Sequence, residues 1–182
     1  MMQTIVPGVR KIYAGSNAYY LDQYGILIDT GVESNRKELL SMINPSAVKT
    51  ILLTHMHYDH IGNVECFLNA DIYASKEEID CLTEKPLATV LDSSRARVIE
   101  GLMGRIKAVP SFPMLRVISC PGHTKGSIAL FMDKEGILFS GDTLFSDGIG
   151  RTDLPTSLPE KMEGTLKKLR QLKYRILCPG HG

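Results

Sequence analysis

The sequence has 182 residues and a mass of 20.1 kDa, which is the size of one ordinary domain. Hydrophobic residues make up 43% and charged residues 23%, which is a globular composition and excludes a disordered or fibrous chain. Lys and Arg number 21 against 20 Asp and Glu, so the net charge of +1 lacks the basic excess that is typical of nucleic-acid binders.

The first half of the sequence mixes strand and helix patterns. Alternating or wholly apolar runs predict strands at 5–12, 18–21, 26–29, 48–53 and 71–74. Helices are predicted at 34–43, at 60–68 and from Ser75 toward Leu82. Ser75 and Glu78 have the spacing of a capping box, in which each side chain bonds the backbone N–H of the other. Pro45 ends the helix that begins at Ser34.

The second half returns to strands and closes with one long helix. Strands are predicted at 115–120, 127–132, 136–140 and 175–178, and a helix at 159–172. Apolar residues between Val90 and Ile106 recur at helical spacing, although Gly101 and Gly104 weaken this pattern. We expect this segment to be a helix packed on a sheet, with a wall of a binding pocket as the alternative. Interleaved strands and helices predict an α/β (α+β) fold of mixed sheets covered by helices.

Neither end of the sequence nor its cysteines indicate export or a membrane. No apolar run approaches the roughly 18 residues of a transmembrane helix, and Pro7 and Gly8 interrupt the segment where a signal peptide would build its apolar region. The four cysteines form no CxxC pair, which favours a reduced, cytoplasmic setting. Nothing divides the chain, so we expect a single domain over residues 1–182.

The five histidines fall in three short segments, which is the most informative feature of the sequence. His55, His57 and His60 lie with Asp59 in the run HMHYDH. His55 and His57 point the same way if they extend a strand, because side chains alternate along a strand with a period of two. Asp59 and His60 then approach from the turn into the next helix. Two pairs directed from two sides at one pocket are the arrangement that two adjacent metal ions need.

Three further residues complete a candidate ligand set. His123 follows a predicted strand in CPGHTKGS, Asp142 follows another in LFSGDTLF, and His181 lies in the terminal CPGHG. Each taken alone is more often a surface or turn residue, so the indication lies in their combination. Cys120 and Cys178, three residues before a histidine, are weighed as ligands but are better explained as small buried hydrophobes. A donor set of nitrogen and oxygen suits zinc, iron or manganese.

The motifs THMHYDHIGN, CPGHTKGS, GDTLF with GIGRTDLP, and CPGHG resemble those of the metallo-β-lactamase fold superfamily. Within it they are most similar to the glyoxalase II-like (hydroxyacylglutathione hydrolase-like) enzymes. The resemblance runs from LIDTG at 27–31 to His181, nearly the whole chain. It implies an αββα sandwich of two mixed sheets flanked by helices. Full glyoxalase II enzymes also carry a C-terminal helical domain that supplies much of the glutathione site, and we expect that domain to be absent here.

The resemblance also implies roles for individual residues. One metal ion would be held by His55, His57 and His123. The second would be held by Asp59, His60 and His181, with Asp142 bridging both. Asp29, at the end of the LIDTG strand, resembles a carboxylate that orients a ligand imidazole, and its alternative is a plain turn residue. Arg151 resembles a basic residue that faces the substrate, and its alternative is a solvated surface charge.

These assignments predict a metal-dependent hydrolase. Our hypothesis is that a hydroxide bridging two divalent ions attacks a small-molecule thioester, with zinc the first choice and iron or manganese the alternatives. All five histidines are committed as ligands, which leaves Asp59 as the catalytic residue that holds the proton of the attacking water. A thiolate leaves readily, so no strong general acid is required.

Competing hypotheses use the same residues differently. The main alternative is a mononuclear iron persulfide dioxygenase, and another is a hydrolase of a different ester or a lactone. A nuclease of the same fold is disfavoured by the near-neutral charge. A flavodiiron protein would need a carboxylate at His57 and a flavin domain, and a true β-lactamase would have other surroundings at Asp142. A non-enzymatic, metal-stabilised binding module is disfavoured because structural zinc sites are closed sets of four ligands.

Overall fold

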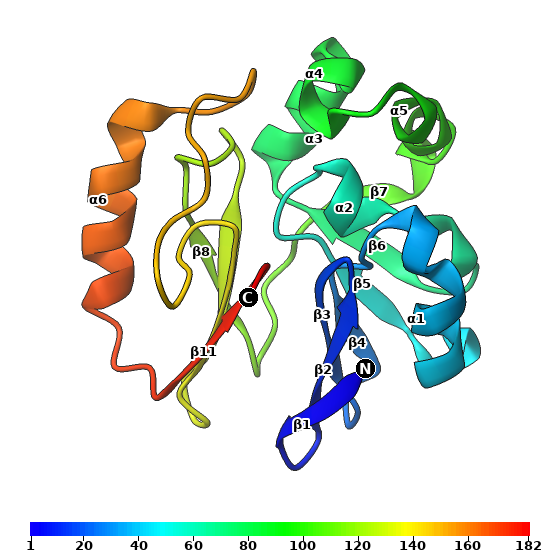
Figure 1. Cartoon of the computed structure of the whole chain (residues 1–182), viewed down its shortest axis with the longest axis horizontal. Helices are drawn as coiled ribbons and strands as arrows, with labels where there is room; N and C mark the ends of the chain where they lie inside the picture. Colours follow the sequence, from blue (N-terminus) through cyan, green and yellow to red (C-terminus); the bar gives the residue numbers. More distant parts are fainter.

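The computed structural model describes residues 1–182 and shows two β-sheets packed face to face with helices on their outer faces (Figure 1). Both sheets are mixed, because each contains parallel and antiparallel neighbours. The predicted α/β class and the αββα sandwich are therefore confirmed.

The larger sheet has seven strands in sequential order, which are β1 (Met2–Val6), β2 (Val9–Ala14), β3 (Ser16–Leu21), β4 (Ile26–Ile28), β5 (Thr50–Leu52), β6 (Asp71–Ala74) and β7 (Ile106–Ala108). Neighbours from β1 to β4 are antiparallel, whereas those from β4 to β7 are parallel. The parallel strands β4 and β5 are buried on both faces, which explains why their sequences are continuously apolar.

The smaller sheet has four strands in the order β11-β10-β9-β8, which are β8 (Arg116–Ser119), β9 (Ile128–Met132), β10 (Ile137–Gly141) and β11 (Ile176–Pro179). The strands β8, β9 and β10 form an antiparallel meander. The last strand, β11, is parallel to β10. As a result β8, β10 and β11 all run in one direction and end at the same edge of the sheet.

Helices cover the outer faces of both sheets. They are α1 (Arg36–Met42), α2 (Tyr58–Ile61), α3 (Lys76–Glu84), α4 (Pro86–Val90), α5 (Ser93–Glu100) and α6 (Pro159–Arg170). Short 3₁₀ turns lie at η1 (Glu33–Asn35), η2 (Pro45–Ala47), η3 (Val64–Cys66) and η4 (Met103–Arg105). The helix α6 lies along the small sheet, and the other helices lie beside the large one (Figure 1). None of the helices has the length and apolar character needed to cross a membrane.

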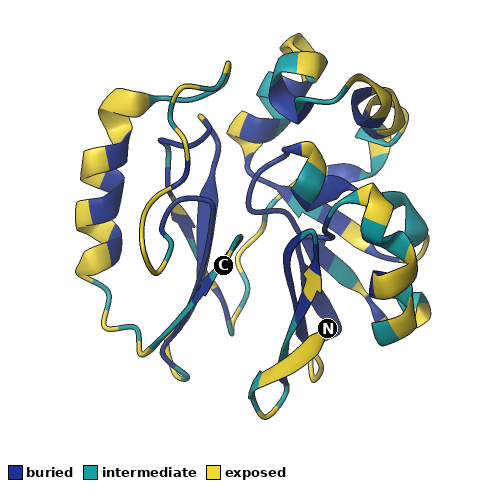
Figure 2. Ribbon diagram, viewed as in Figure 1, coloured by how far each residue is buried: buried dark blue, intermediate teal, exposed yellow.

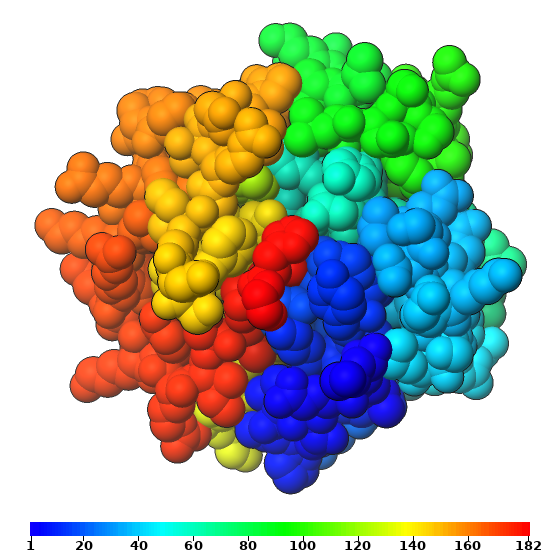
Figure 3. Space-filling model, in the orientation of Figure 1, coloured from blue at the N-terminus to red at the C-terminus, as the bar shows by residue number.

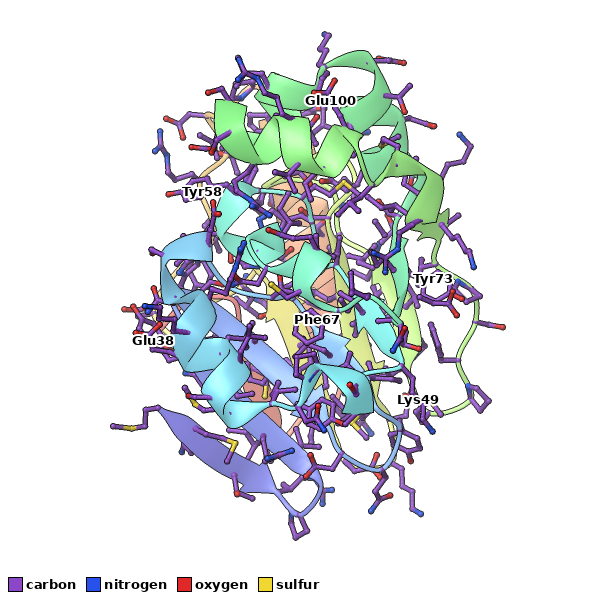
Figure 4. The ribbon with its side chains drawn as sticks, turned by 90° about the vertical axis from the view of Figure 1, so that its right-hand side faces the viewer. Glu38, Lys49, Tyr58, Phe67, Tyr73 and Glu100 are labelled. Carbon is purple, nitrogen blue, oxygen red and sulfur yellow. The ribbon has the colours of Figure 1, made fainter.

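The core consists of three apolar clusters, one for each contact between layers. The helices α1, α3 and α5 pack on the large sheet through a cluster that includes the fully buried Phe67, labelled in Figure 4. The two sheets meet through a second cluster that includes Leu52 of the large sheet and Phe139 of the small one. A third cluster seats α6, whose buried face turns toward the small sheet in Figure 2.

Two elements near the N-terminal half differ from the prediction. The predicted strand over 5–12 is two strands, β1 and β2, because the chain turns at Gly8, which has a φ of +84°. The predicted helix over 60–68 is the single turn α2, which starts two residues earlier and is followed by the turn η3. Both errors have the same cause: the apolar residues continue on either side of a turn, so the pattern alone does not show where the strand or the helix ends.

The segment between Val90 and Ile106 is not one helix. The helix α4 ends at Val90, Leu91 takes a left-handed conformation with a φ of +66°, and Asp92 caps α5 by accepting the Arg95 N–H at 2.8 Å. The chain then enters β7, an edge strand that the sequence pattern did not reveal. The apolar residues of this segment do pack on the large sheet, as expected.

The inter-sheet cluster yields the first prediction. Phe139 is 1% exposed, and its ring meets that of Tyr19 edge-on with centroids 5.2 Å apart. Replacing Phe139 by Ala should lower the free energy of unfolding by about 3–5 kcal/mol, because it removes a large side chain and leaves a cavity. Chemical denaturation measures the loss. Tyr13→Ala, at a side chain that is 54% exposed, is the control and should change it by less than about 0.5 kcal/mol. An equal loss in both variants would contradict this description of the core.

Candidate metal centre

Seven histidine and aspartate side chains meet at one edge of the sandwich, where strands of both sheets end. The large sheet delivers four of them after β5, on the loop and on the helix α2, namely His55, His57, Asp59 and His60. The small sheet delivers three, namely His123 after β8, Asp142 after β10 and His181 after β11. The structure thus brings together every residue of the candidate ligand set.

Three imidazoles form one side of the site. The rings of His55, His57 and His123 have centroids 4.6–4.8 Å apart, and all three side chains are buried. His57 Nδ1 faces His123 Nε2 at 3.0 Å. One nitrogen from each of the three rings lies within 4.8 Å of the others, which is close enough for a single ion to contact all of them.

Asp59, His60 and His181 form the other side. His181 Nε2 lies 3.1 Å from Asp59 Oδ2, and His60 Nε2 lies 3.7 Å from the same oxygen. Asp142 lies between the two groups, because its carboxylate is 3.3 Å from His60, 3.3 Å from His181 and 3.6 Å from His123. A carboxylate in this place can contact ions on both sides.

Hydrogen bonds outside the site orient the imidazoles. His60 Nδ1 donates to Asp29 Oδ2 at 2.8 Å, and His123 Nδ1 donates to the backbone carbonyl of Arg151 at 2.7 Å. His55 Nδ1 donates to Thr54 Oγ1 at 3.1 Å, since that hydroxyl gives its own proton to Asp29. In each ring the second nitrogen, Nε2, is then free to face the site.

Asp29 therefore has more contacts than a turn residue needs. It is 1% exposed and lies directly after β4, with a left-handed φ of +56° that Asp tolerates better than most residues. Its two oxygens accept the N–H and the hydroxyl of Thr54, both at 2.8 Å, as well as the His60 ring. One carboxylate thus ties the end of β4 to the loop and the helix that carry the first four candidate ligands.

The residues fit a divalent cation. His55 Nε2, His60 Nε2 and Asp142 Oδ1 are buried and have no hydrogen-bond partner. A buried polar atom left unpaired costs about 1–3 kcal/mol, so three that face one point need a common partner. Nitrogen and oxygen donors without a thiolate suit zinc, iron or manganese. Cys120 and Cys178 do not join the set, since both are buried in apolar clusters as expected.

The electrostatics of the site favour positive charge at its centre. Burial, together with the neighbouring imidazoles, lowers the pKa of His57 to about 3, so that this ring is neutral. Burial acts against a charge on His60, yet Asp142 and Asp29 raise the pKa of that ring well above its ordinary value. Asp142 and Asp59 likewise raise the pKa of His181 to about 9. The carboxylates therefore attract a cation to the space that His60 and His181 share.

Close packing around Asp142 depends on a glycine. A Cβ on Gly180 would lie 2.1 Å from Asp142 Oδ1 and 2.8 Å from a ring carbon of His60. Only a residue without a side chain lets the last strand approach these two candidate ligands. The glycine of the second Pro-Gly-His sequence, at 179–181, is therefore required by the space that Asp142 and His60 occupy.

Glu78 helps to position the site, although the sequence pattern predicted it only as part of a capping box. Its backbone N–H donates to Ser75 Oγ at 3.1 Å, which is half of the expected capping box. Its carboxylate does not return to Ser75. Instead it is fully buried and accepts the Met56 N–H at 2.8 Å, the Thr124 hydroxyl at 2.6 Å and the Gly126 N–H at 3.1 Å. Glu78 thereby joins the loop between His55 and His57 to the loop that follows His123.

Arg151 borders the site without entering it. Its backbone carbonyl orients His123, as described above, whereas its guanidinium is exposed and forms an ion pair with Asp153 at 2.9 Å. The side chains that line the hollow over the site, besides the candidate ligands, are mainly apolar and include Tyr58, Leu91, Phe145, Ile149 and Leu154. Tyr58 stands on α2 at the edge of the molecule in Figure 4 and is 40% exposed.

Comparison with known proteins gives a consistent result. Residues 14–86 and 89–181 match the sequence pattern of the Metallo-beta-lactamase superfamily. A probable metallo-hydrolase of Streptococcus pyogenes serotype M6 is 34% identical in a match that covers 93% of this chain and 80% of that protein. The di-iron-bound crystal structure of TTHA1623 superposes with a TM-score of 0.74 at 28% identity and covers 100% of this chain and 92% of that one.

A hydroxyacylglutathione hydrolase of Synechococcus sp. (strain JA-2-3B'a(2-13)) is 34% identical over 162 residues. The match covers 84% of this chain but 56% of that enzyme. The chain thus spans about half the length of this relative.

The contacts of Glu78 yield the second prediction. Glu78→Gln places an amide N–H₂ among three donors, so that at least one is left unpaired. We expect the free energy of unfolding to fall by about 1–3 kcal/mol and the affinity for zinc to fall about tenfold or more. Denaturation and a chelator competition measure the two effects. The control is Glu77→Gln on the exposed side of the same helix, which should change neither. Unchanged zinc affinity in Glu78→Gln would contradict a positioning role.

Proposed function

This chain belongs to the metallo-beta-lactamase superfamily and is a metallo-hydrolase of that group, and we propose that it cleaves thioesters. The proposal is supported by the hydroxyacylglutathione hydrolases among its relatives. It extends to the reaction and not to the glutathione part of their substrate, since the chain matches about half of their length.

The single observation that carries the proposal is the convergence of seven histidine and aspartate side chains, of which His55, His57, His60 and Asp142 each have a buried atom without a hydrogen-bond partner. In this proposal His55, His57 and His123 hold one divalent ion. Asp59, His60 and His181 hold a second, and Asp142 contacts both. The second group of three supports a two-ion centre over a mononuclear one, because a single ion would leave these residues without a role.

Two divalent ions, with zinc as our first assignment and iron or manganese as alternatives, would lower the pKa of a water and polarise the carbonyl of the substrate. Asp59 lines the hollow, and in this proposal its carboxylate accepts the proton that the attacking water loses, because the other side chains of the ligand set hold the ions. The water oxygen forms a bond to the thioester carbon, the C–S bond breaks, and the sulfur leaves as a thiolate. The products are a carboxylate and a thiol; the thiol receives one proton of the water, and the second proton is released to solvent.

The hollow favours a substrate with a good leaving group. Outside the seven candidate ligands, the side chains lining it that carry an ionisable group are Tyr58 and Arg151. Neither is placed as a buried general acid, since Tyr58 is 40% exposed and Arg151 is paired with Asp153. A thiol has a pKa near 8.5, so its anion leaves without prior protonation, which an amine would require. A thioester is therefore better matched to this site than an amide.

Arg151 has two parts in the proposal. Its carbonyl fixes the His123 ring, and its guanidinium stands at the mouth of the hollow, where it can meet a polar group of the substrate. The four cysteines are free thiols, which supports placement in a reducing compartment, the cytoplasm. The partner that we propose is a small molecule rather than a nucleic acid, because the net charge is +1.

Asp142 tests the ligand assignment. Asp142→Ala should lose bound metal and hydrolase activity together, because the carboxylate contacts both groups of ligands. Metal content measured by mass spectrometry and thioester hydrolysis measured on the same sample provide the check. The control is Asp133→Ala, which removes an exposed ion pair with Arg116 and should retain both properties. Full metal content in Asp142→Ala would refute the assignment.

The reaction itself can be followed as the loss of the thioester absorbance of S-lactoylglutathione. Zinc-loaded protein should remove that absorbance, and a chelator should stop the reaction. The same protein should consume no oxygen when supplied with glutathione persulfide. Oxygen uptake without thioester loss would overturn the hydrolase proposal in favour of persulfide oxidation. Hydrolysis of other thioesters alone would retain the reaction and exclude glutathione as the preferred thiol.

A further inference from the structure

A second hollow adjoins the one over the candidate metal centre, and most of the side chains that line it are apolar. It is lined by Lys85, Pro86, Leu87, Ala88, Leu91 and Pro155. Leu87 is 58% exposed there, and the helix α4 on which it lies packs into the core through Thr89 and Val90 instead. Leu87 and Pro155, which are distant in the sequence, thus form an apolar surface that does not contribute to the core.

The two hollows adjoin one another. Leu91 lines both of them, and the neighbouring residues Leu154 and Pro155 line one each. In Figure 3 the green segment that contains α4 and the orange segment that precedes α6 approach one another above the cyan segment of α2. Leu91 therefore stands between the hollow over the site of chemistry and the apolar surface beside Leu87.

The backbone at the junction is strained. Leu91 has φ +66° and ψ +9°, a left-handed conformation that costs a residue with a Cβ about 1–2 kcal/mol and that favours glycine. The preceding Val90 is fully buried, but Leu91 itself is not part of the core cluster. This conformation ends the helix α4, since the Leu91 N–H donates to the Leu87 carbonyl at 2.9 Å. It leaves the Leu91 side chain in the lining of both hollows.

Two cations border the two hollows, Lys85 on the second and Arg151 on the first, and the other side chains around them are mainly apolar. Arg151, the cation nearest the centre along the hollow, is already paired with Asp153. The remaining rim of the hollow is formed by Tyr58, Phe145 and Ile149, of which Tyr58 and Ile149 are at least 40% exposed. We propose that the hollow beside Leu87 binds an apolar alkyl arm of the substrate, so that the preferred thioester is one with an extended hydrocarbon chain. This inference rests on the proposed thioester hydrolysis.

Binding can be tested without catalysis. Decanoate and acetate are titrated into the zinc-loaded protein while the methyl resonances of Leu87 and Leu91 are followed by NMR. Decanoate should shift both residues and bind more tightly than acetate, by roughly twofold for each added methylene, which is about half of what full burial would give. Leu87→Glu should abolish this gain. Leu68→Glu, at a leucine that is 77% exposed and lines neither hollow, should leave it unchanged. Equal affinity for decanoate and acetate would overturn the inference.

Activity then distinguishes the two arms of a thioester. Thioesters of N-acetylcysteamine with acyl chains of two to ten carbons extend one arm, and S-alkyl thioacetates of the same lengths extend the other. One series should show kcat/KM rising with chain length, and Leu91→Gly should flatten that rise without lowering the melting temperature, because glycine relieves the strain. Hydrolysis without any dependence on chain length would refute the alkyl arm and leave the proposed reaction standing. No hydrolysis of any thioester would refute the proposed reaction. The decanoate titration would still show whether the hollow beside Leu87 binds an alkyl chain.

Discussion

The packing of the two sheets against each other is the contact on which the candidate metal centre depends. Four of the seven candidate ligands follow strand β5 of the large sheet, and three follow strands of the small one, so neither sheet holds a complete site. The apolar cluster between the sheets keeps the strand ends aligned. Backbone hydrogen bonds secure the junction beside the site, since the Ile128 N–H donates to the Thr54 carbonyl at 2.9 Å and the Asn17 N–H to the Gly180 carbonyl at 2.8 Å. A shift between the layers would separate the donors that a metal ion needs to share.

Two buried carboxylates then determine how the site is assembled. Asp29 fixes Thr54 and His60, and Glu78 joins the loop at Met56 to the loop at Thr124. Both acids hold backbone and side-chain donors in place from outside the ligand set, so that the ligand nitrogens are fixed by contacts with the fold itself. This arrangement suits an enzyme, because preorganised charges stabilise a developing negative charge without rearrangement during the reaction.

Local patterns predict mixed sheets covered by helices and single out the candidate ligands, which the structure brings together. The αββα sandwich and the division of the ligands into two groups come from the family resemblance. Strand periodicity identified the sheets, and the spacing of His55, His57 and His60 gave the approach from two sides. Other features depend on distant contacts that no local pattern contains. Glu78 looked like a capping residue because its partners at Met56 and Thr124 are 22 and 46 residues away. The left-handed turn at Leu91 was hidden because a leucine gives no sign of a positive φ, and that turn divides the expected helix.

The central claim is that the two groups of side chains form one centre for two ions. Anomalous scattering from crystals of the protein loaded with zinc tests this claim most directly. The account predicts two peaks about 3.5–4 Å apart, one among His55, His57 and His123 and one among Asp59, His60 and His181, with Asp142 in contact with both. A single fully occupied peak, or two peaks with Asp142 turned away from either, would contradict it.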